Sequence, residues 1–378
     1  MTTIANKLAR EELVDMVPYQ SARRLYSAGS ESSSPSTTSK IWLNANEASG
    51  PGIYQLSSNC INRYPDFQPD NLINAYSAYA QIDSKNVLAT RGADEGIELI
   101  IRTFCRAYQD SILICPPTYG MYAISAENHG AGIVKVPLIN NQLDLNSLKS
   151  QVGKVKVVFL CSPGNPTGNL LTADSIKSTL EMFGDSAIVV VDEAYIEFSL
   201  ENSTVSWLKK YPQLVILRTL SKAFALAGLR CGFTLANTDI ITMLSKVIAP
   251  YPISAPVAEI ASNALAKTGV EQVSIRVQET TILREQLSAW LNQQNWCQHV
   301  YTSDANFVLF QVKDLTSKTF IFNCLEQQGI LIRDQSKQLQ LSNCLRISIG
   351  SERELSLLKQ TIINAYQNVN EPLSVKEK

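Results

Sequence analysis

The chain has 378 residues, which is enough for two to three domains with a large hydrophobic core and excludes a small disulfide-dependent scaffold. Hydrophobic residues make up 45% of the chain and charged residues 18%, so a highly charged disordered chain is also excluded. The 33 basic and 34 acidic side chains give a formal net charge of -1, without the basic excess that is typical of nucleic-acid-binding proteins.

The eight cysteines stand singly, without a Cys-x-x-Cys pair or zinc-site spacing, so they predict neither a disulfide framework nor a metal site. The chain has two histidines, and we do not expect histidine-based catalysis. Its first 20 residues are polar and amphipathic, and no stretch approaches 18 uncharged apolar residues. We therefore expect a cytoplasmic protein that does not contact a membrane.

The first predicted segment, residues 1–62, is an N-terminal arm followed by a linker. Residues 27–40 are rich in Ser and Thr and contain too few apolar side chains to bury much surface. We assign no function to this stretch.

Residues 63–255 are predicted to form a large domain in which strands alternate with helices. The strands are apolar on both faces, which is typical of a mostly parallel α/β sheet covered by helices. The strand candidates are 86–90, 111–115, 156–161, 187–194, 214–220 and 232–237, and the helix candidates are 94–105, 118–127 and 175–183.

Residues 256–378 are predicted to form a smaller α/β domain. Amphipathic helices are expected at 256–267 and 273–294, and strands at 306–312, 329–334 and 344–350. The last helix begins after Ser351, and Glu354 three residues on completes the pattern of a capping box.

Polar residues follow four of the predicted strands, at the edge where open α/β sheets bind ligands. Each group alone also fits a turn, a helix cap or a solvated chain end. Their order along the chain is most simply explained by one ligand that contacts all of them. The groups are Arg91 to Glu95, the SPGNPTG turn at 162–168, Asp192 to Tyr195, and Ser221-Lys222, with Arg230 and Gly232 behind the last.

These motifs resemble the fold-type-I aminotransferases of class I and II over nearly the whole chain, and most strongly the histidinol-phosphate aminotransferase family. The resemblance implies pyridoxal 5'-phosphate as cofactor. It also implies a large domain with a mostly parallel seven-stranded sheet flanked by helices, a smaller C-terminal α/β domain and an N-terminal arm. The sequence departs from the family at 27–40 and at Ala48-Ser49. The motifs are WLNANE (42–47), NRYPD (62–66), RGADEGIELIIR (91–102), CPPTYGMY (115–122), CSPGNPTG (161–168), VDEAYIEF (191–198), RTLSKAFALAGLRCGF (218–233) and LRISIG (345–350).

The resemblance implies that Lys222 forms a Schiff base with the cofactor and shuttles protons. Such an amine must be neutral part of the time, and we expect the cationic cofactor ring and Arg230 to lower its pKa. Asp192 is implied to keep the pyridine nitrogen protonated, so that the ring can accept electrons. Asn165 and Tyr195 are implied to bind the phenolic oxygen of the ring, and Tyr119 to stack on its face.

The cofactor phosphate is implied to lie at the start of the helix that follows Arg91, where free backbone N–H groups form an anion site. Tyr64 resembles the residue that reaches this phosphate from the neighbouring subunit of a homodimer, although it also fits a packed aromatic beside Pro65. The other implied phosphate ligands are the first residues of the helix, Ala93, Asp94 and Glu95, together with Ser221 and Arg230.

For the substrates, Arg346 resembles the arginine that binds a carboxylate or phosphate with both of its terminal nitrogens. Arg333 and Tyr19 resemble its helpers at the phosphate, and Asn44 and Asn306 are weaker candidates for the same pocket. The implied reaction converts L-histidinol phosphate and 2-oxoglutarate into imidazole acetol phosphate and L-glutamate, a step of histidine biosynthesis.

Three alternatives remain open at this point. A related decarboxylase and an aromatic amino acid aminotransferase of the same fold would use the same cofactor site. A non-enzymatic regulator that binds the cofactor would need a DNA-reading helix and a basic patch. The roughly 60 residues before the NRYPD motif contain neither feature.

Overall fold

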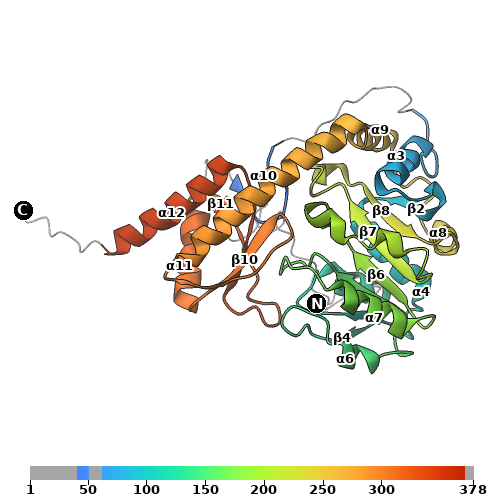
Figure 1. Ribbon diagram of the computed structural model, residues 1–378, viewed down its shortest axis with the longest axis horizontal. Coiled ribbons are helices and arrows are strands. Elements are labelled where there is room, and N and C mark those ends of the chain that lie inside the picture. The colour runs from blue at the N-terminus through green and yellow to red at the C-terminus, as the bar shows by residue number, and fades with distance from the viewer. Residues whose placement is uncertain (1–40, 51–61, 371–378) are drawn as a thin grey trace, which may run out of the picture.

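The computed structural model describes residues 41–50 and 62–370, which are arranged around a large and a small sheet (Figure 1). The Ser-rich stretch at 27–40 lies outside the described residues. The long helix α10 (Lys267–Asn292) runs from the large sheet's helices to the small sheet. This helix is the main regular connection between the two parts of the protein.

The large sheet has seven strands, and its topology confirms the predicted mostly parallel α/β fold. Strand β8 runs antiparallel to both of its neighbours, and the other neighbouring pairs are parallel. The order across the sheet is β2 (Val87–Thr90), β8 (Gly232–Ala236), β7 (Leu214–Thr219), β6 (Ile188–Asp192), β5 (Val157–Cys161), β3 (Ser111–Ile114) and β4 (Gly132–Lys135).

Both faces of this sheet are buried, which explains why its central strands are apolar at nearly every position. In β6, Val189 and Val191 belong to one apolar cluster and Val190 to the other, because successive side chains of a strand point to opposite faces. The first cluster includes side chains of α3 (Asp70–Ala80), α6 (Leu145–Lys149), α7 (Ala173–Phe183) and α9 (Ala255–Ala264), and the second those of α4 (Gly92–Phe104), α5 (Met121–His129) and α8 (Thr238–Ser245).

The small sheet is antiparallel and has its own apolar core, built with α10, α11 (Leu315–Gln327) and α12 (Glu352–Asn370). The strand order is β12 (Arg333–Asp334), β13 (Cys344–Ser348), β10 (Phe307–Val312) and β9 (Cys297–Val300). Ser351 and Glu354 form the expected capping box, since the Ser351 backbone N–H donates to the Glu354 carboxylate at 2.7 Å.

Several elements differ from the predicted ones. The predicted strand at 329–334 is two short strands in different sheets, because β11 (Ile330–Leu331) pairs with β1 (Ile41–Trp42) and not with the small sheet. Strands β4 and β9 were not predicted, since most of their side chains are partly or fully exposed and their sequences lack a long apolar run. Helix α9, which follows the predicted domain boundary at 255, packs on the core of the large sheet.

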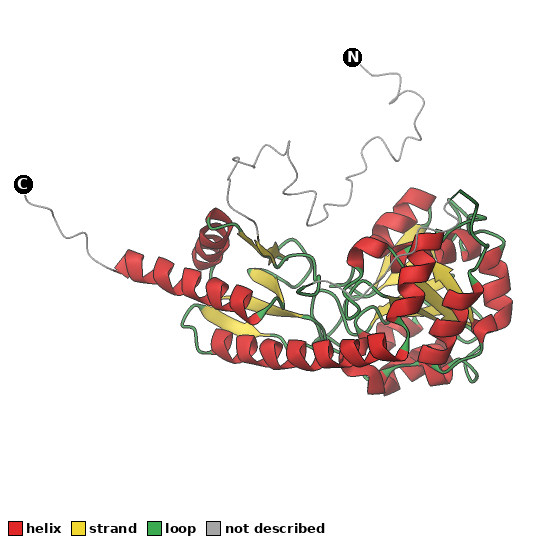
Figure 2. Ribbon diagram, turned by 90° about the horizontal axis from the view of Figure 1, so that it is seen from above, coloured by secondary structure: helices red, strands yellow, loops and turns green. Residues whose placement is uncertain are grey.

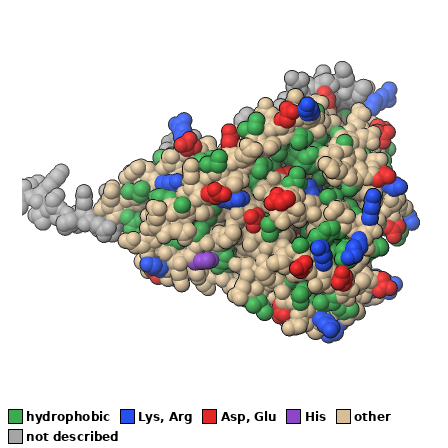
Figure 3. Space-filling view, viewed as in Figure 1, with side chains coloured by type: hydrophobic (Ala, Val, Ile, Leu, Met, Phe, Trp, Pro, Cys, Tyr) green, Lys and Arg blue, Asp and Glu red, His purple; other side chains and the backbone are tan. Residues whose placement is uncertain are grey.

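On the face shown in Figure 3, basic and acidic side chains are interspersed and do not form a patch of one charge.

Figure 2 shows α10 running beside the strands of the small sheet toward the helices of the large sheet. Within residues 41–50 and 62–370, no helix is long and apolar enough to cross a membrane.

A buried ion pair links strands β6 and β7 at their carboxyl ends. Arg218, which is 2% exposed, donates from Nε to Glu193 at 2.7 Å and lies 3.8 Å from Glu197. Its Nη2 also donates to the Ser203 hydroxyl at 2.7 Å. Removing one partner of a buried pair leaves the other charge without compensation, which costs far more than loss of an exposed ion pair.

We predict that Arg218→Met lowers the free energy of unfolding by about 3–5 kcal/mol, because Glu193 and Glu197 would remain buried without a cation. Urea unfolding followed by circular dichroism measures this loss. The matched control is Arg102→Met, at the exposed end of α4, where we expect a change within about 0.5 kcal/mol. Equal losses in both variants would contradict the prediction.

Candidate active site

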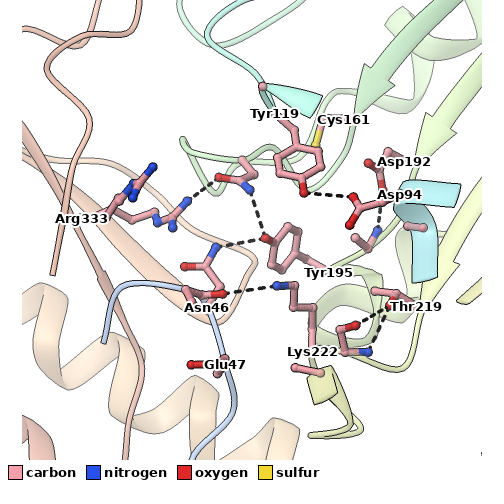
Figure 4. A pocket seen from close by; sticks show the side chains of 18 of the residues that line it. Asn46, Glu47, Asp94, Tyr119, Cys161, Asp192, Tyr195, Thr219, Lys222 and Arg333 are labelled. Carbon is pink, nitrogen blue, oxygen red and sulfur yellow. Dashed lines mark hydrogen bonds between the residues drawn. The ribbon is translucent and has the colours of Figure 1, made fainter. Parts of the chain in front are cut away.

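A cavity of about 530 Å³ lies at the carboxyl ends of the large sheet's strands, facing the small sheet (Figure 4). Its volume is in the range of sites for small molecules and cofactors. The lining residues come from the segment after β1, from the ends of β5, β6 and β7, from the start of α4 and from the small sheet. Those with candidate roles are Asn44, Ala93, Asp94, Tyr119, Asn165, Asp192, Tyr195, Ser221, Lys222, Arg230, Arg333 and Arg346.

Asp192 is the last residue of β6 and is 3% exposed at the wall of the cavity. Its Oδ1 accepts the Ala194 backbone N–H at 3.1 Å, and its Oδ2 accepts the Tyr122 hydroxyl at 2.6 Å. Burial raises the pKa of Asp192 to about 6, and the two hydrogen bonds oppose that rise. The carboxylate is therefore oriented by two donors in a dry environment.

The Tyr195 hydroxyl lies at the wall of the cavity (Figure 4). It accepts N–H donors from the side-chain amides of Asn46, at 3.0 Å, and Asn165, at 3.2 Å. Burial raises the pKa of Tyr195, so the phenol stays protonated. Because two amides already donate to its oxygen, the hydroxyl proton is available for a ligand in the cavity.

Lys222 follows β7 and lies beside the Tyr195 ring, with its Nζ 5.5 Å from the ring centroid. The Nζ donates to the Ala45 carbonyl at 3.4 Å. Burial, followed by the positive charge of Arg346, lowers the pKa of Lys222 from 10.5 to about 8. Arg230, which we expected to be a main cause, contributes less than these two.

The start of α4 and the end of β7 form the anion-binding end of the cavity. Ala93 and Asp94 are in the first turn of α4, and the Ser221 hydroxyl accepts a hydrogen bond from Arg230 Nη1 at 3.3 Å. Arg230 Nη2 also lies 3.2 Å from the Asp94 carboxylate. Gly92 has φ +78, and a Cβ there would come within 2.6 Å of the Arg230 guanidinium, so only glycine permits this close approach.

Tyr119 stands beside this end of the cavity. Its hydroxyl donates to Asp94 Oδ1 at 3.0 Å, and its ring meets Tyr122 edge-on, with centroids 5.7 Å apart. A face of the ring is thus held at the cavity wall, which is the position that a stacking residue needs.

Arg346, on β13 of the small sheet, lies opposite these groups. Its Nη1 donates to Asn165 Oδ1 at 2.5 Å and its Nη2 to the Asn44 carbonyl at 3.2 Å, and the guanidinium lies over the Phe307 ring. Arg333 lines the same end of the cavity. The two arginines make this end suitable for an anion.

Asn44 is 1% exposed and lines the cavity beside Arg346. Both atoms of its side-chain amide are buried and lack a hydrogen-bond partner among the described residues. A buried amide without partners is costly, so this side chain is a candidate to bind a polar ligand.

Three candidates among the described residues do not line the cavity. Tyr64 is 82% exposed and stacks on Tyr251, with centroids 4.5 Å apart. The Glu95 carboxylate lies outside the cavity and accepts hydrogen bonds from the Arg91 guanidinium. Asn306 donates to the Asn46 carbonyl at 3.0 Å, and Tyr19 lies outside the described residues.

The sequence motifs did not single out two residues that contact the candidate catalytic groups. Tyr122 bonds Asp192 from helix α5, and Asn46 bonds Tyr195 from the segment after β1. Both residues lie inside motifs that carry the family resemblance, but no local pattern assigns a partner to either. Their roles depend on contacts across 70 and 149 residues of chain.

The family model of class I and II aminotransferases matches residues 30–362, and the chain belongs to this family. Among its relatives, a histidinol-phosphate aminotransferase of Colwellia psychrerythraea is 64% identical over 94% of this chain and 99% of the relative. A histidinol-phosphate aminotransferase of Yersinia enterocolitica is 51% identical over 93% of this chain and 91% of the relative.

Among solved structures, a histidinol-phosphate aminotransferase of Sinorhizobium meliloti in complex with pyridoxal-5'-phosphate has a similar fold. Its TM-score is 0.77 at 23% identity, over 86% of this chain and 91% of that one. The family is one of pyridoxal-phosphate-dependent aminotransferases, and this chain is such an enzyme. The cavity fits the cofactor, because it combines a lysine amine, a buried carboxylate and an anion-binding end in which Gly92 leaves room for Arg230.

We predict that the cofactor becomes covalently attached to the cofactor-free protein faster as the pH rises toward 8. An amine reacts only in its neutral form, which predominates above its pKa, and the pKa of Lys222 is about 8. The rate, followed by absorbance, should rise about tenfold per pH unit below pH 8 and level off above it. Nα-acetyllysine, which keeps a free side-chain amine, serves as the control for titration of the cofactor itself. A midpoint near 10.5, the ordinary value, would contradict the prediction.

Proposed function

We propose that this enzyme transfers an amino group from L-histidinol phosphate to 2-oxoglutarate, giving imidazole acetol phosphate and L-glutamate, in histidine biosynthesis. The observation that carries the proposal is that one cavity has Lys222 and Asp192 on the large sheet and Arg346 and Arg333 opposite them. The relatives named histidinol-phosphate aminotransferase, at 64% and 51% identity, support the choice of substrate.

When bound, pyridoxal phosphate supplies an aldehyde that links to amines and a ring that withdraws electrons from the attached carbon. In the proposal, Asp192 pairs with the ring nitrogen, and Asn165 and Tyr195 donate to the phenolic oxygen. Tyr119 covers a face of the ring. The phosphate is held by Ser221, Arg230 and the first turn of α4, where Ala93, Asp94 and Glu95 supply backbone N–H groups.

Lys222 is the proposed base. Because its pKa is lowered to about 8, roughly a tenth of the amine is neutral at pH 7. A neutral Lys222 could take a proton from the substrate carbon that carries the amino group, and the resulting ammonium would deliver it to the cofactor carbon that takes over the nitrogen, so that the amino group stays with the cofactor. The neighbouring Tyr195 hydroxyl keeps its proton and can donate a hydrogen bond throughout.

Substrate anions are proposed to bind at the opposite end of the cavity. Arg346 offers two terminal nitrogens, and Asn165 and the Asn44 carbonyl keep its guanidinium in place. Arg333 adds a second positive charge, and the unpartnered Asn44 amide adds a donor. Tyr19 is proposed to help at the substrate phosphate.

We further propose a homodimer in which Tyr64 reaches the cofactor phosphate of the partner. Support comes from its position, since the ring is 82% exposed and is held outward by stacking on Tyr251. Residues 63–255 and 256–378 are proposed to act as two domains on either side of the cavity. Since the proposed substrates are soluble metabolites, we propose that the enzyme works in the cytoplasm.

The function is tested by mixing the holoenzyme with 2-oxoglutarate and measuring glutamate. We predict that glutamate forms only when L-histidinol phosphate is present and that Lys222→Ala abolishes its formation. Phenylalanine and phosphothreonine replace histidinol phosphate in parallel reactions, the latter with carbon dioxide as the measured product. A kcat/KM for either compound that exceeds the value for L-histidinol phosphate would contradict the proposed substrate.

The homodimer is tested by complementation between Lys222→Ala and Tyr64→Ala chains, each first shown to be impaired alone. If Tyr64 acts across the interface, each mixed dimer has one intact site and one with both defects. After random exchange of equal amounts, roughly a quarter of all sites should regain activity. Activity that stays at the mean of the two parents would show that Tyr64 serves its own subunit or neither.

A further inference from the structure

Tyr122 is buried beneath the cavity and makes a hydrogen bond that the roles above do not use. Its side chain is 0% exposed, does not line the cavity, and donates to Asp192 Oδ2 at 2.6 Å. Asp192 itself lines the cavity. Tyr122 therefore contacts a proposed cofactor ligand from outside the cavity.

We propose that Tyr122 is a positioning residue that keeps the Asp192 carboxylate ionised and aimed at the ring nitrogen of the cofactor. This inference rests on the proposed role of Asp192. It assigns to α5 a part in the chemistry, beyond the stacking proposed for Tyr119, which lies just before this helix.

The carboxylate needs such support because its surroundings favour the neutral form. Burial raises the pKa of Asp192, and the negative charges of Asp94 on α4 and Glu193 beyond β6 raise it further. Cys161 on β5 faces the same carboxylate, and burial keeps that thiol protonated. The two groups that lower the pKa of Asp192 are the Tyr122 hydroxyl and the Ala194 N–H. Of these, only the Tyr122 hydroxyl belongs to a side chain.

Packing holds the Tyr122 hydroxyl in place. Its ring stacks on Phe159 of β5, with centroids 4.7 Å apart and planes 11° apart, and meets Tyr119 edge-on. Burial also raises the pKa of Tyr122, so the hydroxyl stays a donor. A phenylalanine would keep both ring contacts and lose only the donor, so packing and hydrogen bonding can be separated by one substitution.

The test measures the affinity of the cofactor-free protein for pyridoxal phosphate, by fluorescence quenching, between pH 5 and 8.5. An ionised Asp192 is required for tight binding, so affinity falls below the pKa of this group, about 6 in the wild type. In Tyr122→Phe we expect the midpoint of this fall to move up by about one pH unit, since a hydrogen bond to a charged group is lost. Near pH 8 the affinity should stay within about threefold of wild type.

Tyr76→Phe is the matched control. Tyr76 is also buried and stacks on Phe233, and its hydroxyl has no hydrogen-bond partner within the described part of the chain. We expect its midpoint to equal that of the wild type. Because titration of the cofactor is the same in all three proteins, a difference in midpoint belongs to the protein.

A uniform loss of affinity at every pH, with an unchanged midpoint, would show that Tyr122 has only a packing role and would overturn the proposal. The pair is also tested in Asp192→Asn, where adding Tyr122→Phe should shift nothing, because no carboxylate is left to titrate. If Tyr122→Phe does not fold, the single variant Asp192→Asn is measured instead, and we expect it to lack the fall in cofactor affinity near pH 6. A fall near pH 6 that persists in Asp192→Asn would likewise overturn the proposal.

The test does not depend on substrate, so its outcome is separate from that of the proposed function. A shifted midpoint in a protein that does not use histidinol phosphate would support the role of Tyr122 and reject the proposed substrate. Amino transfer from histidinol phosphate with an unshifted midpoint would do the reverse.

Discussion

The buried ion pair between Glu193 and Arg218 joins the two strand ends on which the candidate site depends. Glu193 directly follows Asp192, and Arg218 lies four residues before Lys222. Both charges are buried, so either one without the other would be costly, and the ends of β6 and β7 cannot separate cheaply. The spacing between the carboxylate and the amine is thus maintained by a contact outside the cavity.

Burial acts on the two groups in opposite directions. It disfavours charge, and therefore raises the pKa of Asp192 and lowers that of Lys222. A neutral amine suits the proposed base, and Arg346 strengthens the effect from across the cavity. A neutral carboxyl would not suit a partner for a protonated ring nitrogen, so the same dry site that prepares Lys222 requires a donor beside Asp192. Tyr122 supplies that donor.

Much of the candidate site follows from residues at the ends of predicted strands. Asp192, Tyr195, Ser221 and Lys222 were expected there, and the structure places all four around one cavity. Tyr122 and Asn46 were not singled out, because a helix residue and a loop residue show no local sign of the partner they will meet. The main causes of the lowered Lys222 pKa were missed for the same reason, since Arg346 is far away in the chain.

The sequence by itself determined the type of sheet, six of the seven strands that build it and the edge that carries the polar groups. Those properties depend on apolar runs and turn residues, which act over a few positions. Only the tertiary structure decided which groups meet across the cavity. Arg346 reaches Asn165 from 181 residues away, and the short pairing of β1 with β11 brings Asn44 beside it. Such contacts arise from packing between elements, because burial and charge act through space and not along the chain.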